Sequence, residues 1–407
     1  MKGLTHFISG VAVSTFFPEA VRMARDDKSW ILVLGGLYGI LPDTLDFKLG
    51  RFLEDEEYVV DPDPNDVDAR KIGEVVQKAL DACVRENREV KISFRTVRLG
   101  VDYWRRYSIE FVPDKDGYSR EVKIEVGPIV STGQIPFPGT EPEEPEKRSY
   151  AFKPPFPLFG AREKATSIDI LNGPEFSFRP TKDGKIEVIF LPWHRQWSHS
   201  YTMGLALGMW SWIGSIVFGN MAFFPGLLTW LGIIGGFSAG FFLIKKFFRS
   251  FWGRLSATLF YFVGTFVSAL LLGRTFGVSP FSSPYYLYLV IPTLGFWTHI
   301  TEDMLGFMGG NLLWPITTDR TRGLKISKAS DPIPNFFFIW TSLLVILWNL
   351  DRFAPKHFLD WRYLFAAWFP VFVVYVVSIA ISLSRRWQES LTGGYADSEG
   401  EAEEVVE

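Results

Sequence analysis

The sequence predicts a polytopic all-α membrane protein of about eight transmembrane helices with an inserted α+β soluble domain. Three observations lead to this prediction. The stretch from Tyr201 to Thr301 contains no Asp or Glu, a composition typical of membrane segments. Further apolar runs lie on both sides of this stretch. By contrast, the segment from Gly50 to Pro192 is rich in charge and has no apolar run long enough to cross a bilayer.

A bilayer core of about 30 Å needs roughly 20 mostly apolar residues per helix. The first apolar run carries Pro18, Glu19 and Arg22 in its second half, and a signal peptide is the alternative interpretation of it. No small-residue cleavage site follows that run. We therefore expect spans at Leu4–Met23, Trp30–Phe47, Tyr201–Phe223, Leu227–Leu243, Leu255–Leu272, Pro284–Met308, Phe336–Leu350 and Tyr363–Leu383.

Basic loops predict the orientation, since Lys and Arg in short connections stay on the cytoplasmic side of a membrane. Three basic segments, Lys245–Arg254, Asp319–Lys328 and Ser384–Trp387, fall on one face when eight spans are drawn. The same face holds both termini and the inserted domain. We therefore predict a multi-pass protein of the plasma (inner) membrane, with both termini and the insert in the cytoplasm.

The spans divide the chain into the first two transmembrane helices (residues 1–49), the insert (50–192), a six-helix transmembrane region (193–387) and an acidic, disordered tail (388–407). Within the insert, Val67–Glu86 has apolar residues at helical spacing, which predicts one amphipathic helix. Alternating stretches after it predict an antiparallel meander. The proline-dense segment Ser131–Gly160 is expected to be an exposed loop, and two last strands are expected near Ala165–Leu171 and Lys185–Leu191.

Charge and cysteine content exclude several classes of function. The chain has 42 Lys and Arg against 45 Asp and Glu, a formal net charge of −3, which argues against a nucleic-acid partner. The lone cysteine, Cys83, excludes a disulfide framework and a cysteine metal cluster. Function is therefore expected from non-cysteine chemistry near a bilayer, with membrane lipids as partners.

Histidines and acids gather at the ends of the predicted spans, where four of the five histidines lie. An unpaired charge in apolar sequence costs at least roughly 2.5–3.5 kcal/mol, so the acids need partners. Neutral imidazole and carboxylate are the ligands that divalent metals take in proteins. We predict metal ligands at His6, Asp43, Asp46, His194, His199, His299 and Asp303, with Glu302 and Arg195 as candidate catalytic residues.

Spacing and topology bring these residues toward one place. Asp43 and Asp46 are three residues apart and His299 and Asp303 are four apart, so each pair shares one face of a helix. His194 and His199 do not share a face, and we expect His194 in the loop before a helix and His199 in its first turns. With eight spans all of these clusters lie at the cytoplasmic face, which predicts a single site.

Several of these residues also have simpler interpretations. Asp46 is a possible counter-ion for Lys48, and the segment WHRQWSHS suits an aromatic belt at the headgroups. Arg195 suits a phosphate or a developing oxyanion, or an ordinary lipid headgroup. On a helix, Glu302 points away from Asp303. It suits a general base, a residue that orients a ligand, or a salt-bridge partner of Arg320 or Arg322. His357 lies in a loop on the opposite side and is expected to be a surface residue.

Five motifs lie in order along the spans: T-H-x-x-x-G (Thr5–Gly10), L-P-D-x-x-D (Leu41–Asp46), H-R-x-x-S-H-S (His194–Ser200), H-x-x-x-D (His299–Asp303) and G-G-N-L-L-W-P (Gly309–Pro315). Together they resemble the family of inner-membrane metal-dependent hydrolases that includes the bacterial YdjM-like proteins. The resemblance covers the spans but not the insert, and the family's PD-x-D aspartate spacing is one residue longer here. It implies metal-dependent hydrolysis and leaves the substrate open.

Our first hypothesis is therefore a hydrolase in which one or two divalent metals activate water at the cytoplasmic membrane interface. Zinc is the default for a histidine-rich site, with manganese or iron as alternatives when carboxylates contribute. A site at headgroup level suggests a phosphoester or other ester of an amphiphilic, lipid-like substrate. The alternatives are a proton- or metal-ion-coupled transporter, and a membrane-anchored protein whose insert binds a protein partner.

Overall fold

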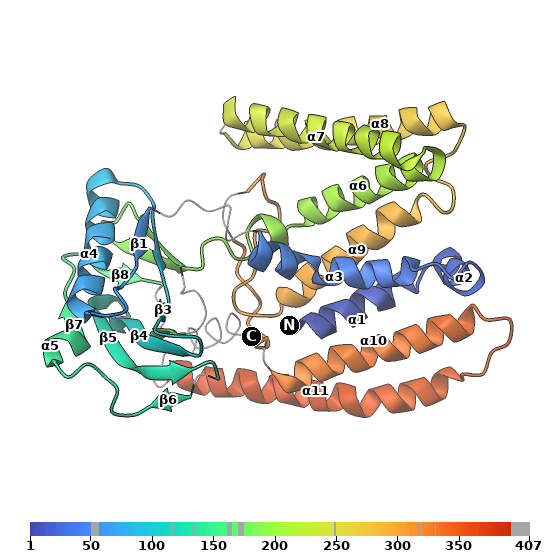
Figure 1. The fold of residues 1–407 in the computed structure, drawn as a ribbon. Helices are drawn as coiled ribbons and strands as arrows, with labels where there is room; N and C mark the ends of the chain where they lie inside the picture. Colours follow the sequence, from blue (N-terminus) through green and yellow to red (C-terminus); the bar gives the residue numbers. More distant parts are fainter. Residues whose placement is uncertain are drawn as a thin grey trace. The chain divides into compact units, whose positions relative to one another are not determined.

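The computed structural model of the chain describes residues 1–49, 57–114, 117–133, 135–160, 165–169, 175–247, 250–317, 320–329 and 331–391. The chain forms two compact units. One comprises Met1–Gly50 and Arg195–Gln388 and is helical, and the other comprises Arg51–His194 and is built on a sheet. We refer to them as the helical unit and the sheet unit (Figure 1). Of the predicted acidic, disordered tail, residues 388–391 belong to the last helix, which ends at Leu391, and the rest lies outside the described residues.

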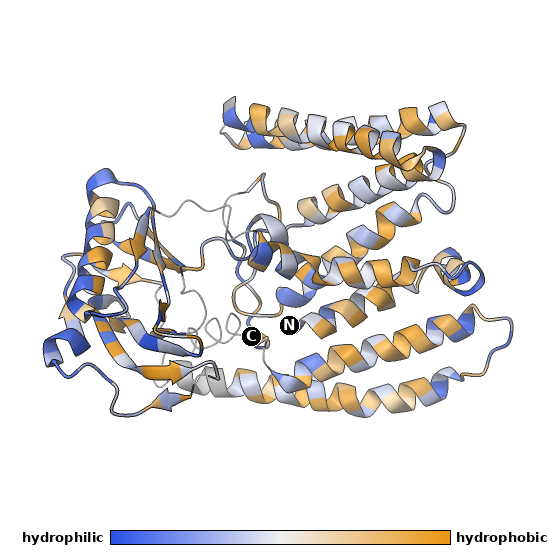
Figure 2. Cartoon of the chain, viewed as in Figure 1, coloured by the Kyte–Doolittle hydropathy of each residue, from blue (hydrophilic) through white to orange (hydrophobic). Residues whose placement is uncertain are grey.

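The helical unit carries mostly apolar helices, whereas hydrophilic and hydrophobic residues are mixed along the elements of the sheet unit (Figure 2). Its helices are α1 (Gly3–Ser14), α2 (Pro18–Asp26), α3 (Ile31–Lys48), α6 (Tyr201–Asn220), α7 (Phe223–Phe247), α8 (Phe251–Phe276), α9 (Leu287–Asp303), α10 (Pro332–Arg352) and α11 (Trp361–Leu391). A short 3-10 helix, η2 (Trp197–His199), precedes α6.

Five of these helices, α6, α7, α8, α10 and α11, are long and apolar enough to cross a membrane. The pair α2 and α3 also qualifies if it is counted as one span, but it is bent by 116°. The expected first span is divided, because Pro18 begins a new helix after α1 has ended at Ser14. A 12-residue helix such as α1 is about 18 Å long, which is short of a bilayer core. The lengths therefore support a membrane protein, while the number of eight spans stays a prediction.

Glycines allow α1, α3 and α9 to cross at very short range. A Cβ atom added at Gly39 would overlap the carbonyl oxygen of His6, and one at Gly10 would overlap that of Gly35. A Cβ at Gly295 on α9 would also overlap the Gly35 carbonyl. Small residues at such crossings are typical of helix packing in membranes. These glycines therefore let the three helices approach closely, which matters because each helix carries a predicted site residue.

Polar side chains also join α1 to α10 along their length. The contacts on α10 come from Asn335, Ser342 and Asn349, which are seven residues apart and so share one face. Thr5 donates a hydrogen bond to Asn335 Oδ1 at 2.8 Å, and Asn349 donates one to Thr15 Oγ1 at 2.9 Å. Such hydrogen bonds between membrane helices contribute about 0.6 kcal/mol each on average.

The sheet unit packs one helix, α4 (Ala69–Glu86), on a sheet. The helix begins at the side-chain cap of Asp68 and ends at Asn87 in the left-handed conformation. In the described part of this unit eleven strands join in the order β1-β2-β10-β11-β8-β5-β4-β3, with β6 and β7 on β5 and β9 on β4. They are β1 (Tyr58–Val60), β2 (Val90–Phe94), β3 (Val97–Arg98), β4 (Tyr103–Pro113), β5 (Ser119–Ser131), β6 (Pro136–Phe137), β7 (Ser149–Phe152), β8 (Leu158–Phe159), β9 (Thr166–Ile168), β10 (Glu175–Pro180) and β11 (Ile186–Phe190).

The predicted amphipathic helix of the insert is confirmed as α4, whose Ile72, Val76 and Leu80 are buried in the core of this unit. The predicted meander is only partly right. β4 and β5 form a long antiparallel pair. β2, which was expected to pair with them, instead lies between β1 and β10. Pairing between strands far apart in sequence cannot be read from local alternation, and β1 and β10 were not expected at all.

The expectation of an exposed loop at Ser131–Gly160 is wrong for its second half. There β7 pairs with β5, and Leu158 at the start of β8 is fully buried. The side chain of Tyr150 on β7 packs where a Cβ of Gly73 on α4 would stand. The prolines therefore mark breaks between short strands. The alternation of polar and apolar residues in Ser149–Phe152 was the sequence signal for β7.

Candidate metal centre

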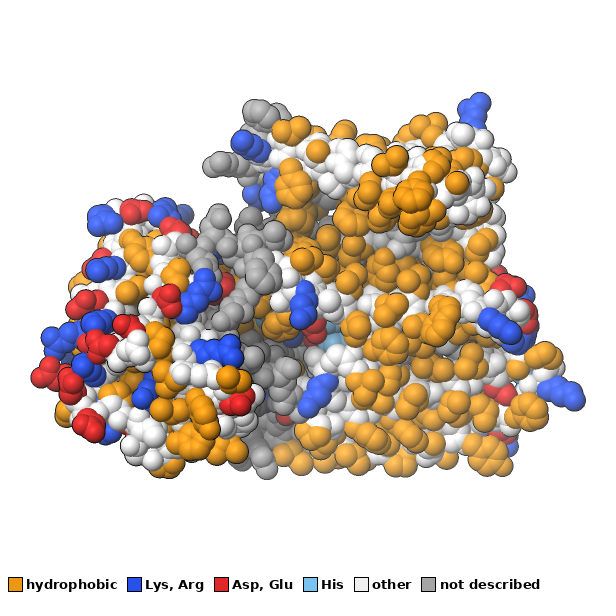
Figure 3. Space-filling model, in the orientation of Figure 1, with side chains coloured by type: hydrophobic (Ala, Val, Ile, Leu, Met, Phe, Trp, Pro, Cys, Tyr) orange, Lys and Arg blue, Asp and Glu red, His pale blue; other side chains and the backbone are white. Residues whose placement is uncertain are grey.

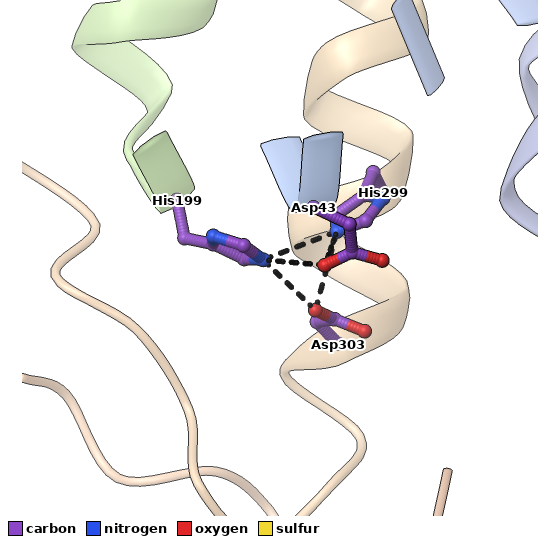
Figure 4. A group of neighbouring side chains, drawn as sticks. All are labelled: Asp43, His199, His299 and Asp303. Carbon is purple, nitrogen blue, oxygen red and sulfur yellow. Dashed lines mark hydrogen bonds and ion pairs between the residues drawn. The ribbon is translucent and has the colours of Figure 1, made fainter. Parts of the chain in front are cut away.

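Four side chains from three parts of the helical unit meet at one point (Figure 4). Asp43 lies near the end of α3, and His199 ends η2 just before α6. His299 and Asp303 lie four residues apart at the end of α9, so one helix face presents both. The structure thus brings together residues that are up to 260 positions apart in the sequence.

The four ligand atoms lie at the spacing of a tetrahedral metal site. His199 Nε2 is 3.2 Å from His299 Nε2, 3.4 Å from Asp43 Oδ1 and 3.3 Å from Asp303 Oδ2. His299 Nε2 is 3.5 Å from Asp43 Oδ1 and 3.3 Å from Asp303 Oδ2. A zinc ion with bonds of about 2.0–2.2 Å would require about 3.3–3.6 Å between tetrahedral ligands. The two carboxylate oxygens lie within 4.8 Å of each other, so the group can hold a metal ion.

Hydrogen bonds fix both imidazoles with Nε2 toward the common point. His299 Nδ1 lies 2.7 Å from the carbonyl oxygen of Gly39, which only accepts, so Nδ1 carries the proton. His199 Nδ1 lies 3.2 Å from Asp46 Oδ2 on the side away from the other ligands. A neutral His299 therefore presents a lone pair on Nε2, which is what a metal ligand requires, and His199 would do the same with its proton on Nδ1 toward Asp46.

Asp46 acts behind His199 and is not one of the four. Its Oδ2 accepts the backbone N–H of Arg195 at 2.7 Å, and its Oδ1 accepts the hydroxyl of Ser198. The carboxylate is completely buried. This is the arrangement in which an acid orients a ligating histidine. Asp43 and Asp46 therefore approach different nitrogens of His199, Asp43 at Nε2 and Asp46 at Nδ1.

Charge in the group is partly balanced by Arg195. Its Nη2 lies 3.0 Å from Asp303 Oδ2, and both side chains are buried. The backbone of Arg195 is in the left-handed region, with φ of 56°, and its carbonyl accepts the N–H of Asn311 at 3.0 Å. The Arg195 guanidinium therefore forms an ion pair with Asp303, which is one of the four candidate ligands.

The electrostatic surroundings of His199 favour positive charge at this point. His199 precedes the apolar helix α6, and burial alone would lower its pKa. The carboxylates of Asp46, Asp303 and Asp43 outweigh burial and hold the pKa well above its ordinary value. The carboxylates therefore favour a positive charge at this point, which a proton on His199 or a bound metal ion would supply.

Access to the four residues is through Asp43. Its side chain is 30% exposed, whereas those of His199, His299 and Asp303 are at most 3% exposed. Three of the four candidate ligands are thus buried, and Asp43 is the one that solvent reaches.

His6 and Glu302 form a second buried pair next to the four. The ring of His6 lies against that of His299, with centroids 3.8 Å apart and the ring planes tilted by 32°. Its Nδ1 lies 2.7 Å from Glu302 Oε2 and its Nε2 lies 3.3 Å from Asp303 Oδ1. The amino group of Met1 lies 2.9 Å from the same Asp303 oxygen. Glu302 thus faces His6 across the helix pair.

The remaining histidines lie elsewhere. His194 is buried in the sheet unit, where its ring meets Trp193 edge to face at 5.7 Å. The structure does not bring it into the group of four. His357 is 62% exposed and its Nδ1 lies 2.8 Å from the Asp351 carbonyl, as expected of a surface residue.

Sequence reasoning missed Asn311 and Gly39 as supports of the site. Asn311 is fully buried, and its side chain exchanges hydrogen bonds with Thr317 at 2.8 and 3.2 Å while its N–H holds the Arg195 carbonyl. A polar Asn in the run GGNLLWP was the available signal. Gly39 offered only its place in the glycine-rich LGGLYG run.

Comparison of the chain with protein-family models, with curated proteins and with solved structures found no match. Fold and site therefore characterise the chain by themselves. The apolar helices indicate a membrane protein with a soluble α+β domain, and the buried group Asp43, His199, His299 and Asp303 is suited to a metal ion.

Proposed function

We propose that this protein is a membrane-embedded, metal-dependent hydrolase. The observation that supports it most is the pair of Nε2 atoms, 3.2 Å apart, with two carboxylates beside them. A proton or a metal ion between two such atoms offsets their repulsion. These residues would hold a divalent cation, which would supply a Lewis acid that activates water for attack on an ester bond.

The residues of the chain then have distinct tasks. His199, His299, Asp43 and Asp303 bind the ion, while Asp46 and the Gly39 carbonyl orient the two imidazoles. Arg195 offsets part of the negative charge through Asp303 instead of reaching outward to a phosphate. The pair of Glu302 and His6 lies next to the ligands and is our candidate for moving protons during the reaction.

Zinc is the ion we favour, because two imidazoles, two carboxylates and tetrahedral spacing match its preferences. Manganese and iron accept the same ligands. A second ion would have to use His6 and the other oxygen of Asp303, which are 3.3 Å apart. We propose one ion as the resting content.

We further propose that the site faces the cytoplasm at the level of the lipid headgroups. All the site residues lie at helix ends, and the basic segments of the chain predict which side is cytoplasmic. In this topology the short helices α1 and α9 are embedded with the longer ones, as the eight-segment prediction requires. An open side at headgroup level suits a phosphoester or ester of an amphiphilic, lipid-like substrate.

Metal content of the detergent-purified protein tests the proposal independently of activity. We expect about one equivalent of a divalent metal in wild type and in the control His357→Ala, and little in His299→Ala and Asp43→Asn. Each variant is compared by gel filtration and thermal unfolding. A wild type that holds no metal and cannot be reloaded would refute the hydrolase.

Activity is tested next with the loaded protein. Esters and phosphoesters of short amphiphiles are screened in detergent, with the metal-free variants as blanks. Loss of turnover in Asp43→Asn alongside loss of metal is the expected result. Metal bound stoichiometrically but passed across reconstituted vesicles without hydrolysis would favour the transporter alternative.

A further inference from the structure

The helix α2 lies at the end of the helical unit that is remote from the metal centre. It connects α1 to α3, and the pair α2 and α3 is bent by 116°. This angle leaves α2 closer to perpendicular to α3 than to a continuation or a reversal of it. Figure 1 shows α2 at the end of α3 where α10 leads into α11. Asp43 and Asp46 lie near the other end of α3, so most of that helix separates α2 from the candidate ligands.

Local sequence explains the two sharp turns around α2. Phe17 is extended, as a residue before proline prefers, and Pro18 then begins the helix. At the other end Lys28 has a left-handed backbone, with φ of 52°. Ser29 Oγ accepts the N–H of Ile31 at 3.3 Å, where α3 begins. α2 is therefore a separate helix and not a bent part of α1 or α3.

Hydrogen bonds hold α2 at the level where α10 ends and α9 begins. Arg25 Nη1 donates to the carbonyl of Phe353 at 3.1 Å, and Phe353 directly follows α10. Tyr286, the residue before α9, donates its hydroxyl to Glu19 Oε2 at 3.1 Å. Both ends of α2 are thus tied to helix ends of the same unit.

α10 gives the distance between α2 and the metal centre, because it is long and apolar enough to cross a membrane. Its 21 residues extend about 31 Å, close to the thickness of a bilayer core. Near the start of α10, Asn335 accepts the hydroxyl of Thr5, the residue before His6. His6 lies against the ligand His299. α2, at the other end of α10, is therefore about one core thickness from the metal centre.

The two faces of α2 differ in polarity. Its inner face packs Ala20 with Ile31 and Leu287, at the starts of α3 and α9. Its outer face carries two ion pairs whose side chains are 37–57% exposed, Arg22 with Glu19 and Arg25 with Asp26. Because each of these cations is paired with an acid, the outer face does not require an anionic lipid.

Exposed aromatic side chains flank α2. Phe16 is 59% exposed at one end of the helix, and Trp30 is 79% exposed at the other. Phe358 and Trp361, in the connection from α10 to α11, are exposed as well. On the face shown in Figure 3, hydrophobic side chains cover the sides of the helical unit, and charged ones gather at the end that carries α2. Aromatic residues are enriched at such a boundary in membrane proteins.

We propose that α2 lies in the plane of the membrane, in the headgroup layer remote from the metal centre, with Phe16 and Trp30 inserted into the bilayer. The bilayer is the occupant that the contacts support, because α3 begins directly after Trp30 and the membrane-length helix α10 ends beside α2. An amphipathic helix with flanking aromatic rings is suited to that depth. α3 then crosses the membrane alone, since its 18 residues extend about 27 Å.

The test measures the depth of a dye at both ends of α2 in the full-length protein. In a Cys83→Ala background, Phe16→Cys or Trp30→Cys is labelled with a nitrobenzoxadiazole dye and reconstituted in phosphatidylcholine vesicles that contain nitroxide lipids. Val263→Cys, exposed at the middle of α8, is the deep control. We expect a nitroxide at the headgroup to quench both α2 reporters more than one at the chain end, by similar ratios, and the reverse order at Val263→Cys.

Other results would overturn the proposal. α2 has 9 residues and is about 13 Å long, so two reporters that differ in depth by that length would mean that α2 runs along the membrane normal. Stronger quenching of both by the chain-end nitroxide would mean that α2 re-enters the bilayer core. Blue-shifted emission that no lipid quenches would mean that protein covers this end, and unshifted, unquenched emission would place it in water.

A second reporter guards against a disturbed fold. Arg22→Cys removes an exposed side chain on the outer face of α2, so it leaves the buried contacts of the helix intact. We expect the headgroup nitroxide to quench this reporter more than the chain-end nitroxide does. The opposite order would contradict the placement of α2 in the headgroup layer, whatever the other two reporters show.

Discussion

Replacing Asp46 by Asn separates an orienting role from a ligand role. The Asp46 carboxylate accepts hydrogen bonds from the Arg195 N–H and the Ser198 hydroxyl, and lies 3.2 Å from His199 Nδ1. An amide of the same shape accepts with only one of its two ends, so one buried donor loses its partner. Loss of a partner behind a ligating histidine typically weakens metal affinity by about 10–100-fold, or about 1.4–2.7 kcal/mol.

The assay is a competition titration with a chromophoric chelator on wild type, Asp46→Asn, Asp43→Asn and the exposed control Asp26→Asn. We expect stoichiometric but weaker metal in Asp46→Asn and no measurable binding in Asp43→Asn. If Asp46→Asn lost its metal as completely as Asp43→Asn, Asp46 would be a ligand, as the sequence suggested. Wild-type affinity in Asp46→Asn would refute the orienting role of the carboxylate.

Two further predictions concern packing and the thiol. Gly39→Ala places a Cβ against the His6 carbonyl, so α3 must move, and we expect a loss of about 1–3 kcal/mol of stability. Because the Gly39 carbonyl orients His299, we also expect the variant to bind less metal. Gly232→Ala on α7, where a Cβ meets nothing within 4 Å, is the control in thermal unfolding, and equal behaviour of the two variants would contradict the argument. Cys83 is fully buried, and burial raises its pKa to about 11, so maleimide should label it slowly in the native protein, faster as the pH approaches that pKa, and rapidly in denaturant. Equal rates in native and denatured protein would show that the helix α4 does not protect it.

The sequence allowed the gathering of His and Asp residues to be predicted, but not their separate roles. Span ends and helical spacing pointed to Asp43, His199, His299 and Asp303, and these are the four that meet. The same evidence treated Asp46 as a ligand. Asp46 reaches Nδ1 of His199 because of the local backbone at Arg195. That residue has a left-handed conformation, which no spacing rule predicts.

Predictions for the fold failed where contacts are distant in sequence. Apolar runs correctly identified α6, α7, α8, α10 and α11. The break between α1 and α2 followed from Pro18, a local signal that competed with a long apolar stretch. In the sheet unit, β1 pairs with β2 across the whole of α4, and β10 joins β2 from more than 80 residues away. Such pairings depend on burying both faces of a strand, which alternation alone does not reveal.

Close packing of α1, α3 and α9 and the geometry of the site have one cause. Gly39 has no side chain, so its backbone can lie between His6 of α1 and His299 of α9. The Gly39 carbonyl then sets the tautomer of His299, and the ring of His6, which packs against that imidazole, limits its movement. Asp43, one turn further along α3, is thereby placed at 3.5 Å from the same imidazole. A larger residue at the crossing would shift Asp43 and His299 by different amounts, so the glycine determines the distance between two ligands as well as between two helices.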